Sequence, residues 1–182
     1  MAKPAIFLDR DGTLVEEVNY LHRPEDMCLF PNTGTALQRL KNAGYLLVVV
    51  TNQSGIGRGI YGEDDMHRVH EALQEQVGGL IDGFYHCPHL PCDGCECRKP
   101  GLKMITDAVR DLEIDLDGSW MVGDKKIDVE TGRAASLQTA LVLTGYGRSH
   151  RDSLEAPPDV IADDLGDAAA EILRLTSAKV VV

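Results

Sequence analysis

The sequence lacks long apolar runs and has few positive charges. Among its 182 residues no uninterrupted apolar stretch is long enough to span a bilayer, and the short apolar segment before Asp9 does not resemble a signal peptide. Lys and Arg total 18 against 29 Asp and Glu, so the formal net charge is −11. We therefore expect a cytoplasmic protein with no nucleic acid and no membrane among its partners. A phosphorylated substrate is compatible with this charge, because a few cations and a metal can reverse the sign inside a cleft.

Internal repeats, low-complexity tracts and linkers are missing as well. The length suits one domain with a well-buried core and is short for two. A hydrophobic fraction of 43% and a charged fraction of 26% are typical of globular proteins. We expect a single domain over residues 1–182 and a monomer.

Apolar segments alternate with amphipathic ones along the chain. The valine-rich run Tyr45–Val50 is typical of a strand that is covered on both faces. Strands separated by helices predict a Rossmann-like three-layer α/β/α fold with a central parallel sheet. The expected strands are Ala5–Leu8, Tyr45–Val50, Gly83–His86, Ser119–Val122, Thr139–Leu143 and Val160–Ile161, and the expected helices are Thr33–Asn42, Glu63–Val77, Lys103–Leu112, Val129–Ala135 and Leu165–Leu175.

Polar motifs follow three of these strands directly. They are Asp9-Arg10-Asp11, Thr51-Asn52-Gln53 and Gly123-Asp124-Lys125. The carboxyl ends of parallel strands meet at one edge of a sheet, so we expect these motifs to lie together. Neighbouring carboxylates repel each other unless a cation compensates, and Mg²⁺ prefers such oxygen ligands. Taken singly, each Asp could be a turn or cap residue, and Asp128 suits either the metal site or a helix N-cap.

These motifs resemble those of the haloacid dehalogenase superfamily of phosphatases. Asp9-Arg10-Asp11-Gly12-Thr13-Leu14 is similar to the first motif, Thr51 to the second, Lys99 to the third and Gly123–Asp128 to the fourth, in the expected order. The resemblance implies catalysis through an aspartyl-phosphate. Asp9 would be the nucleophile, Asp11 the acid and base, and Thr51 and Lys99 would contact the phosphoryl group. It also implies a catalytic Mg²⁺ bound by Asp9, Asp124 and the backbone carbonyl of Asp11.

Four of the five cysteines lie between positions 87 and 97. Without an export signal we expect a reducing compartment, which favours a metal over disulfides. Cys87, His89, Cys95 and Cys97 form a Cys-x-His…Cys-x-Cys set suited to a closed, structural Zn²⁺ site. Free thiols beside a surface histidine are the alternative. Cys92 is a surplus ligand, and from the spacing alone it could replace His89 or Cys87 or be a solvent-facing bystander.

The cysteine loop, residues 87–97, resembles the zinc loop of a narrower group within the superfamily, the D,D-heptose 1,7-bisphosphate phosphatases and the related histidinol-phosphatase domains. The resemblance implies that the loop takes the place of a large cap domain, and that Cys92 is not a ligand. It implies a small phosphorylated sugar as substrate, D-glycero-D-manno-heptose 1,7-bisphosphate, which would lose its 7-phosphate during synthesis of activated heptose for surface polysaccharide. Histidinol phosphate is the first alternative, and a non-catalytic, zinc-stabilised binding protein is the second.

Substrate contacts are expected from four segments. The segment after the first motif resembles the substrate-contacting flap of the family, although hairpin-turn roles for Asn19 and Tyr20 remain an alternative. The candidates are Glu17, Val18, Asn19 and Tyr20 in that segment, Asn52, Gln53 and Ser54 beside Thr51, Arg98 beside Lys99, and Lys125 beside Asp124. Residues 54–59 are rich in glycine but lack the spacing of a dinucleotide fingerprint, so we expect a phosphate-approaching turn or a flexible connection. His22, His67, His70, His86 and His150 receive no role.

Overall fold

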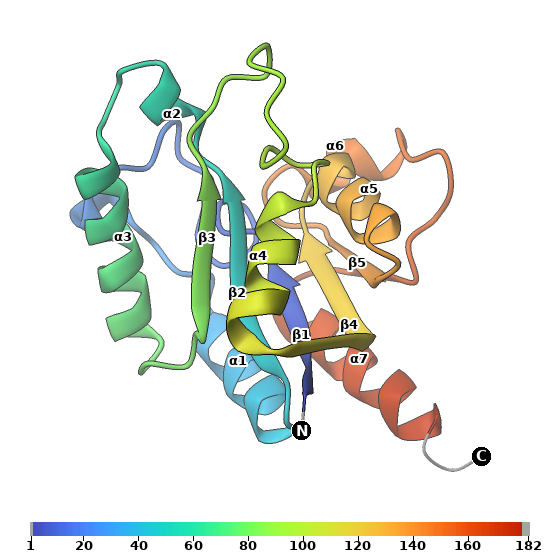
Figure 1. The fold of residues 1–182 in the computed structure, drawn as a ribbon. Helices are drawn as coiled ribbons and strands as arrows, with labels where there is room; N and C mark the ends of the chain where they lie inside the picture. The colour runs from blue at the N-terminus through green and yellow to red at the C-terminus, as the bar shows by residue number, and fades with distance from the viewer. Residues whose placement is uncertain (1, 180–182) are drawn as a thin grey trace.

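Six parallel strands form the central sheet of the computed structural model, which describes residues 2–179 (Figure 1). The strand order is β3-β2-β1-β4-β5-β6, and all the pairings are parallel. The strands are β1 Lys3–Leu8, β2 Leu46–Asn52, β3 Gly83–Cys87, β4 Ile114–Gly123, β5 Gln138–Val142 and β6 Val160–Ala162. The predicted fold class is confirmed.

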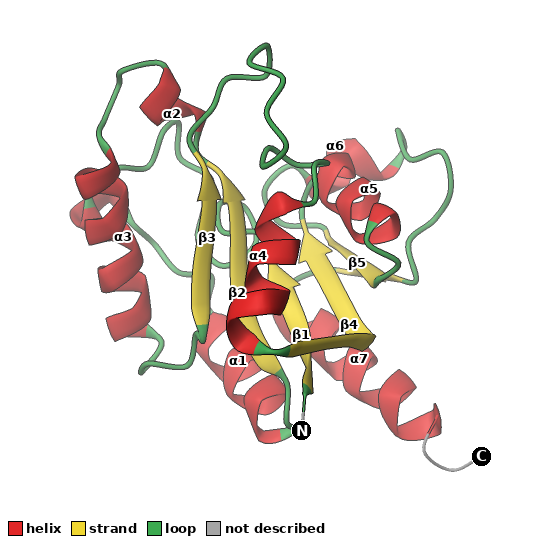
Figure 2. Ribbon diagram, in the orientation of Figure 1, coloured by secondary structure: helices red, strands yellow, loops and turns green. Residues whose placement is uncertain are grey.

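Helices cover both faces of this sheet. In Figure 1, α4 crosses in front of the sheet while α1 and α7 lie behind it. The longer helices are α1 Thr33–Asn42, α3 Glu63–Gln76, α4 Lys103–Leu112, α5 Lys126–Ala134 and α7 Leu165–Lys179, and the short ones are the 3-10 helix Pro24–Asp26, α2 Ser54–Gly57 and α6 Gly147–Arg151 (Figure 2). None of the described helices combines the length and the apolarity that crossing a membrane requires.

Alternate residues of the inner strands enter two separate hydrophobic clusters. In β1, Ile6 and Leu8 pack in the cluster that includes residues of α1, α3 and α7, whereas Phe7 packs in the cluster on the α4 face. In β2, Val49 packs in the first of these clusters and Val48 in the second. Because both faces are covered, these strands have no polar side, which explains the continuous apolar runs in the sequence.

The structure differs from the sequence-based expectation at several element boundaries. Strand β4 begins at Ile114 and not at Ser119, and α5 begins at Lys126 and not at Val129. The segment added to β4, Ile114–Gly118, is a short alternation of apolar and acidic residues that ends in a glycine, and the segment added to α5 is the single turn Lys126–Asp128. The glycine-rich segment is not a simple turn, since it contains the short helix α2. That helix begins directly after Gln53, and so it continues the Thr51-Asn52-Gln53 motif at the end of β2.

His70 on α3 is buried, although the sequence offered no reason to single it out. Its ring stacks on Phe84 with a centroid distance of 4.6 Å, and its Nε2 has no hydrogen-bond partner in the described part of the chain. Burial, together with the charges of Arg10 and of two neighbouring histidines, lowers the pKa of His70 from 6.5 to about 2. The folded protein therefore holds this histidine neutral.

This burial predicts acid sensitivity of the fold. The unfolded chain binds a proton at His70 below its ordinary pKa, whereas the folded chain does not, so stability is lost as pH falls from about 6.5 towards 2. We expect this residue to reduce the free energy of unfolding by roughly 1 kcal/mol per pH unit in the middle of that range. Urea unfolding of wild type and His70→Leu at several pH values measures the effect. Equal pH slopes in the two proteins would contradict it.

Candidate active site

The carboxyl ends of β1, β2 and β4 bring three predicted site residues together. Asp9 follows β1, Thr51 lies at the end of β2, and Asp124 follows β4. All three are buried. Strand β1 lies between β2 and β4, where chain connections run to opposite sides of the sheet, and such a switch point is where open α/β sheets bind ligands. The expected convergence of the motifs is thus observed.

Asp124 has an unusual environment for a carboxylate. Its Oδ2 accepts the backbone N–H of Tyr146 at 2.8 Å, whereas its buried Oδ1 accepts no hydrogen bond from the described residues. The nearest cation to Oδ1 is Lys125 Nζ, at 3.9 Å. Burial, and then the charge of Asp9, raises the pKa of Asp124 to about 8. The surrounding residues therefore supply too little positive charge to balance an ionised Asp124 carboxylate.

Glycines leave room for this carboxylate. A Cβ on Gly12 would lie 2.2 Å from Asp124 Oδ2, and one on Gly145 would lie 2.3 Å from the same atom. Oxygen atoms of Asp9, Asp124 and Asp128 all lie within 4.8 Å of one another. A tight cradle with clustered carboxylates and one unpaired oxygen fits the ligand preferences of Mg²⁺. The residues present therefore suit the expected metal.

Lys99 forms the centre of a buried ion-pair group. Its Nζ lies 2.9 Å from Asp9 Oδ1 and 2.6 Å from Asp128 Oδ1, and it also donates to the carbonyl of Val50 at 3.0 Å. Burial alone would lower the pKa of Lys99, but the charges of Asp128 and Asp9 raise it. Burial alone would raise the pKa of Asp9, but Lys99 and Lys125 lower it. Asp9 is therefore an ionised carboxylate, as a nucleophile must be.

The structure decides what Asp128 contacts, which the sequence left open. It is the third residue of α5, and its Oδ2 accepts the N–H of Lys125 just before that helix at 3.0 Å. Its Oδ1 is paired with Lys99. Both oxygens are therefore engaged by protein groups. Asp128 caps the helix and orients Lys99 towards Asp9. Asp124 Oδ1 is the buried carboxylate oxygen that remains available for a cation.

Two adjoining clefts lie over this group. The first has a volume of about 230 Å³ and is lined by Asp9, Asp11, Thr51, Asn52, Ser54, Arg98, Lys99, Lys125 and Ile127. The second has a volume of about 250 Å³ and is lined by Asp11, Glu17, Val18, Asn19, Tyr20, Leu21, Asn52, Gln53, Ser54, Gly55, Tyr61, Lys125 and Tyr146. All the residues expected to contact substrate therefore line one cleft or both. The residues that line both clefts, and so lie on the boundary between them, are Asp11, Asn52, Ser54 and Lys125.

Tyr146 is a cleft residue that the sequence-based prediction missed. It lies after β5, and its ring is 5.1 Å from Lys125 Nζ in a cation–π geometry. Lys125 is also held by Glu17, at 3.0 Å. Tyr146 belongs to a short polar segment that directly follows a strand, the same signal that identified Asp9 and Asp124. Applying that signal to β5 as well would have found it.

The four predicted zinc ligands come together in the loop after β3. Five of the six distances among Cys87 Sγ, Cys95 Sγ, Cys97 Sγ and His89 Nδ1 lie between 3.1 and 3.6 Å, and all the ligand atoms lie within 4.8 Å of one another. Tetrahedral zinc with Zn–S bonds of about 2.3 Å places two sulfurs about 3.8 Å apart, so the set is close to the required shape. Burial raises the pKa of Cys87. Hydrogen bonds from the Arg98 N–H and neighbouring thiols outweigh burial at Cys95 and lower its pKa to about 7.

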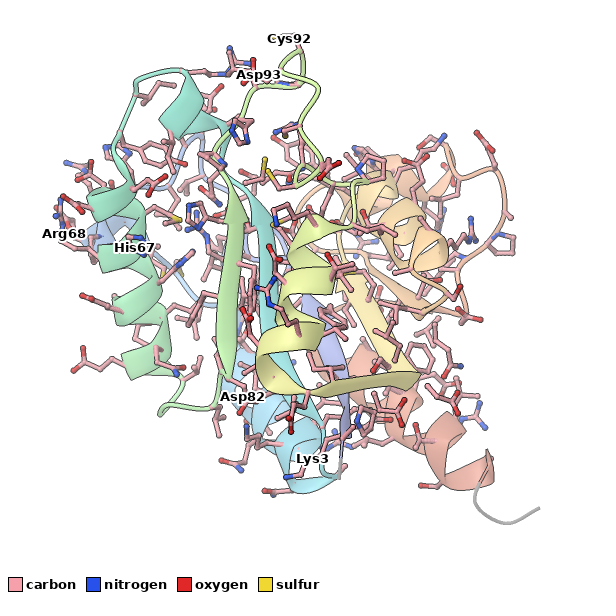
Figure 3. The ribbon with its side chains drawn as sticks, in the orientation of Figure 1. Lys3, His67, Arg68, Asp82, Cys92 and Asp93 are labelled. Carbon is pink, nitrogen blue, oxygen red and sulfur yellow. The ribbon has the colours of Figure 1, made fainter. Side chains whose placement is uncertain are left out.

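Cys92 lies apart from this set. Figure 3 shows Cys92 and Asp93 at the tip of the loop, at the end of the molecule opposite Lys3. The Cys92 side chain is exposed, and its sulfur contacts only Asp93, at 3.9 Å, among the interactions of the described residues. The placement agrees with the expectation that Cys92 is not a ligand.

The cysteine loop leads directly into the active site. Arg98 donates to the carbonyl of His89 at 3.2 Å, and the backbone N–H of Lys99 donates to Asn52 Oδ1 at 3.0 Å. These contacts join the loop to the end of β2. The position of Lys99 therefore depends on the conformation of the loop before it.

Comparisons with known proteins agree with this geometry. A family model described as HAD-hydrolase-like matches residues 96–168. The D-glycero-beta-D-manno-heptose-1,7-bisphosphate 7-phosphatase of Haemophilus ducreyi is 40% identical over 92% of this chain and 97% of its own. The enzyme of the same name from Pseudomonas aeruginosa is 36% identical over 96% and 100%. The crystal structure of D,D-heptose 1,7-bisphosphate phosphatase from B. bronchiseptica, complexed with magnesium and phosphate, has a TM-score of 0.87 and 31% identity over 94% of this chain and 99% of that one.

Proposed function

Because the chain belongs to the haloacid dehalogenase-like hydrolases, in the family of D-glycero-D-manno-heptose-1,7-bisphosphate 7-phosphatases, we propose that it hydrolyses the 7-phosphate of D-glycero-D-manno-heptose 1,7-bisphosphate. The observation that carries the proposal is the buried group in which Lys99 lies against the Asp9 carboxylate at the end of β1, beside a polar cleft. The proposal takes the chain as one catalytic domain, since a single sheet positions all these residues.

In the first half of the reaction, Asp9 attacks phosphorus and the bond to the sugar oxygen breaks. The lowered pKa of Asp9, which Lys99 and Lys125 produce against the effect of burial, keeps this carboxylate ionised. Lys99 and the Thr51 hydroxyl hold the phosphoryl oxygens. Asp11 gives its proton to the leaving sugar oxygen. Bound Mg²⁺, held by Asp9, Asp124 and the backbone carbonyl of Asp11, would supply positive charge that offsets the repulsion between carboxylate and phosphate.

In the second half, water attacks the phosphoryl group carried by Asp9. Asp11, now a carboxylate, takes a proton from that water, and the phosphorus–oxygen bond to Asp9 breaks. Inorganic phosphate leaves, and both aspartates return to their starting states. Asp11 lies on the boundary of the two clefts, so it faces the phosphate on one side and the departing sugar on the other.

The second cleft is the proposed site for the sugar. Its polar lining includes the Glu17 carboxylate, the Asn19 amide and the Tyr20 hydroxyl, which can bind sugar hydroxyls. Arg98 in the first cleft and Lys125 between the clefts supply positive charge for phosphate groups. Asn52 and Ser54 line both clefts, beside the transferring phosphate.

A direct comparison of substrates tests the proposal. With Mg²⁺ present, we expect kcat/KM for heptose 1,7-bisphosphate to exceed that for histidinol phosphate by at least about tenfold, because only the sugar provides hydroxyls for the second cleft. Phosphate release measured under identical conditions gives both values. Chelation of the metal should stop turnover of both esters. A higher kcat/KM for histidinol phosphate would contradict the proposed substrate.

We propose further that the cysteine loop binds structural Zn²⁺ through Cys87, His89, Cys95 and Cys97. A loop with little core of its own gains its folding energy from such a metal. We expect Cys87→Ser to lose zinc and to lower activity at least about tenfold, through displacement of Lys99. Cys92→Ser is the matched control and should keep both. Elemental analysis and phosphate release measure the two effects, and zinc loss in the Cys92 variant would overturn the ligand assignment.

A further inference from the structure

Asp11 is held by two neighbouring side chains. Arg10 Nε donates to its Oδ2 at 3.1 Å and Arg10 Nη2 donates to its Oδ1 at 3.1 Å. Gln53 Nε2 donates to Asp11 Oδ2 at 2.9 Å. Arg10 is fully buried, whereas the side chain of Asp11 keeps 15% of its surface exposed, in the clefts. The carboxyl group is thus fixed on one side and open to substrate on the other.

The amide of Gln53 can take only one orientation. Its Nε2 also donates to the Thr51 hydroxyl at 2.8 Å, and its Oε1 accepts from Arg10 Nη2 at 3.1 Å. A guanidinium only donates and a carboxylate only accepts, so exchanging the two ends of the amide would break both charged contacts. Gln53 is 3% exposed. All its polar atoms are engaged by the protein, which differs from the sequence-based expectation that this side chain contacts substrate.

Tyr61, which also lines the second cleft, completes this arrangement. Its hydroxyl donates to Gln53 Oε1 at 2.6 Å. The ring stacks on His22 with a centroid distance of 5.4 Å, and a Cβ on Gly55 would lie 2.1 Å from it. The ring therefore has no room to shift towards α2. Tyr61 itself is 7% exposed, so Gln53 is supported by a packed and buried side chain.

We propose that Gln53, supported by Tyr61, is a positioning residue that sets the Asp11 carboxyl in reach of the leaving oxygen. The inference rests on the proposed function, because it concerns the proton that Asp11 gives to the sugar oxygen. The same amide holds Thr51, so one side chain sets the distance between the proton donor and the phosphoryl-binding hydroxyl. Proton transfer depends steeply on such distances, whereas Lys99, the other phosphoryl-binding residue, makes no hydrogen bond to this amide among the described residues.

The dependence on leaving group separates this role from others. A sugar alkoxide is a poor leaving group and needs the proton from Asp11, whereas p-nitrophenolate is a good leaving group and departs without a proton. The ratio kcat/KM depends only on the steps up to transfer of the phosphoryl group onto Asp9, so it does not include the later attack of water. We expect Gln53→Leu to lower kcat/KM roughly 30-fold with heptose bisphosphate and no more than about threefold with p-nitrophenyl phosphate. Tyr61→Phe keeps the ring and should give the same selectivity with a smaller loss, about fivefold with the sugar.

Two further variants serve as the positive and the negative control. Asp11→Asn removes the proton donor itself and should show the same selectivity with a larger loss. Gln74→Leu is the matched control, because Gln74 is an equally engaged amide that bonds only the backbone of Ile81 among the described residues. It should leave the ratio of the two substrates unchanged. Melting temperatures report whether each variant is folded, and Tyr61→Phe carries the test if Gln53→Leu does not fold.

Any outcome without this selectivity between the two substrates overturns the inference. Equal losses on both substrates would place Gln53 in phosphate binding, and a rise in KM for the sugar with unchanged kcat would make it a substrate contact. A wild-type protein with no Mg²⁺-dependent turnover of either ester overturns the proposed function together with this inference. An active wild type whose Gln53 and Tyr61 variants show no selectivity overturns the inference alone.

Discussion

Asp9→Asn will abolish phosphate release, with a loss in kcat of at least about 10³-fold. The amide has the same shape as the carboxylate, so it fits the same buried position next to Lys99. It has no negative charge and is a very poor nucleophile, so the phosphoryl group has no acceptor. Rapid quenching followed by mass spectrometry should find a phosphorylated chain in wild type during turnover and none in the variant.

A matched control separates this chemical effect from a general effect of removing a carboxylate. Asp163 is exposed on the surface, and Asp163→Asn should keep wild-type activity. Melting temperatures of the two variants measure whether both are folded. An Asp9→Asn protein that retains more than about a tenth of wild-type kcat would exclude Asp9 as the nucleophile, because no other group could replace it so efficiently.

Lys99→Met will have the second-largest effect, and it will lower both activity and stability. The substitution removes the cation between Asp9 and Asp128, both of which are buried. Breaking a buried ion pair by deleting one partner costs about 3–5 kcal/mol of unfolding free energy, since it leaves uncompensated charge. The lost stabilisation of phosphoryl oxygens should lower kcat about 10²–10³-fold. Urea unfolding and phosphate release measure the two effects separately.

Asp128→Asn is the companion variant for this prediction. An amide at position 128 keeps an oxygen for the N–H of Lys125 but loses the charge that aims Lys99. We expect kcat to fall only about tenfold, because the Lys99–Asp9 contact remains. If Lys99→Met left both kcat and stability unchanged, the buried ion-pair group would have no part in catalysis. A loss for Asp128→Asn as large as that for Lys99→Met would instead indicate direct metal binding by Asp128.

Helix prediction succeeded at both ends of two helices. The bounds of α1, Thr33–Asn42, and of α4, Lys103–Leu112, are those expected from the sequence. It failed at the start of α5, where Lys126 precedes the apolar positions. The first turn of that helix is stabilised by Asp128, whose carboxylate accepts a backbone N–H and binds Lys99. Contacts of this kind leave no periodic signal in a sequence.

The site was largely predictable as a set of residues but not as a set of contacts. Strand-end position identified Asp9, Thr51 and Asp124, because each lies beside an apolar run that any reader of the sequence can find. Gln53 was also identified, but with a different interpretation, since its partners Arg10 and Asp11 follow β1 and its partner Tyr61 lies just before α3. Tyr61 carries no motif, and only its packing brings its hydroxyl to that amide.

The sequence by itself determined the parallel α/β architecture, the carboxylate motifs at the strand ends and the composition of the cysteine loop. These features depend on local patterns, namely apolar periodicity and the spacing of a few polar residues. The tertiary structure alone decided which carboxylate oxygen stays unpaired, which aspartate holds Lys99 and which amide holds Asp11. Those outcomes depend on distances of a few ångströms between segments far apart in the chain, and such distances are set only when the core packs.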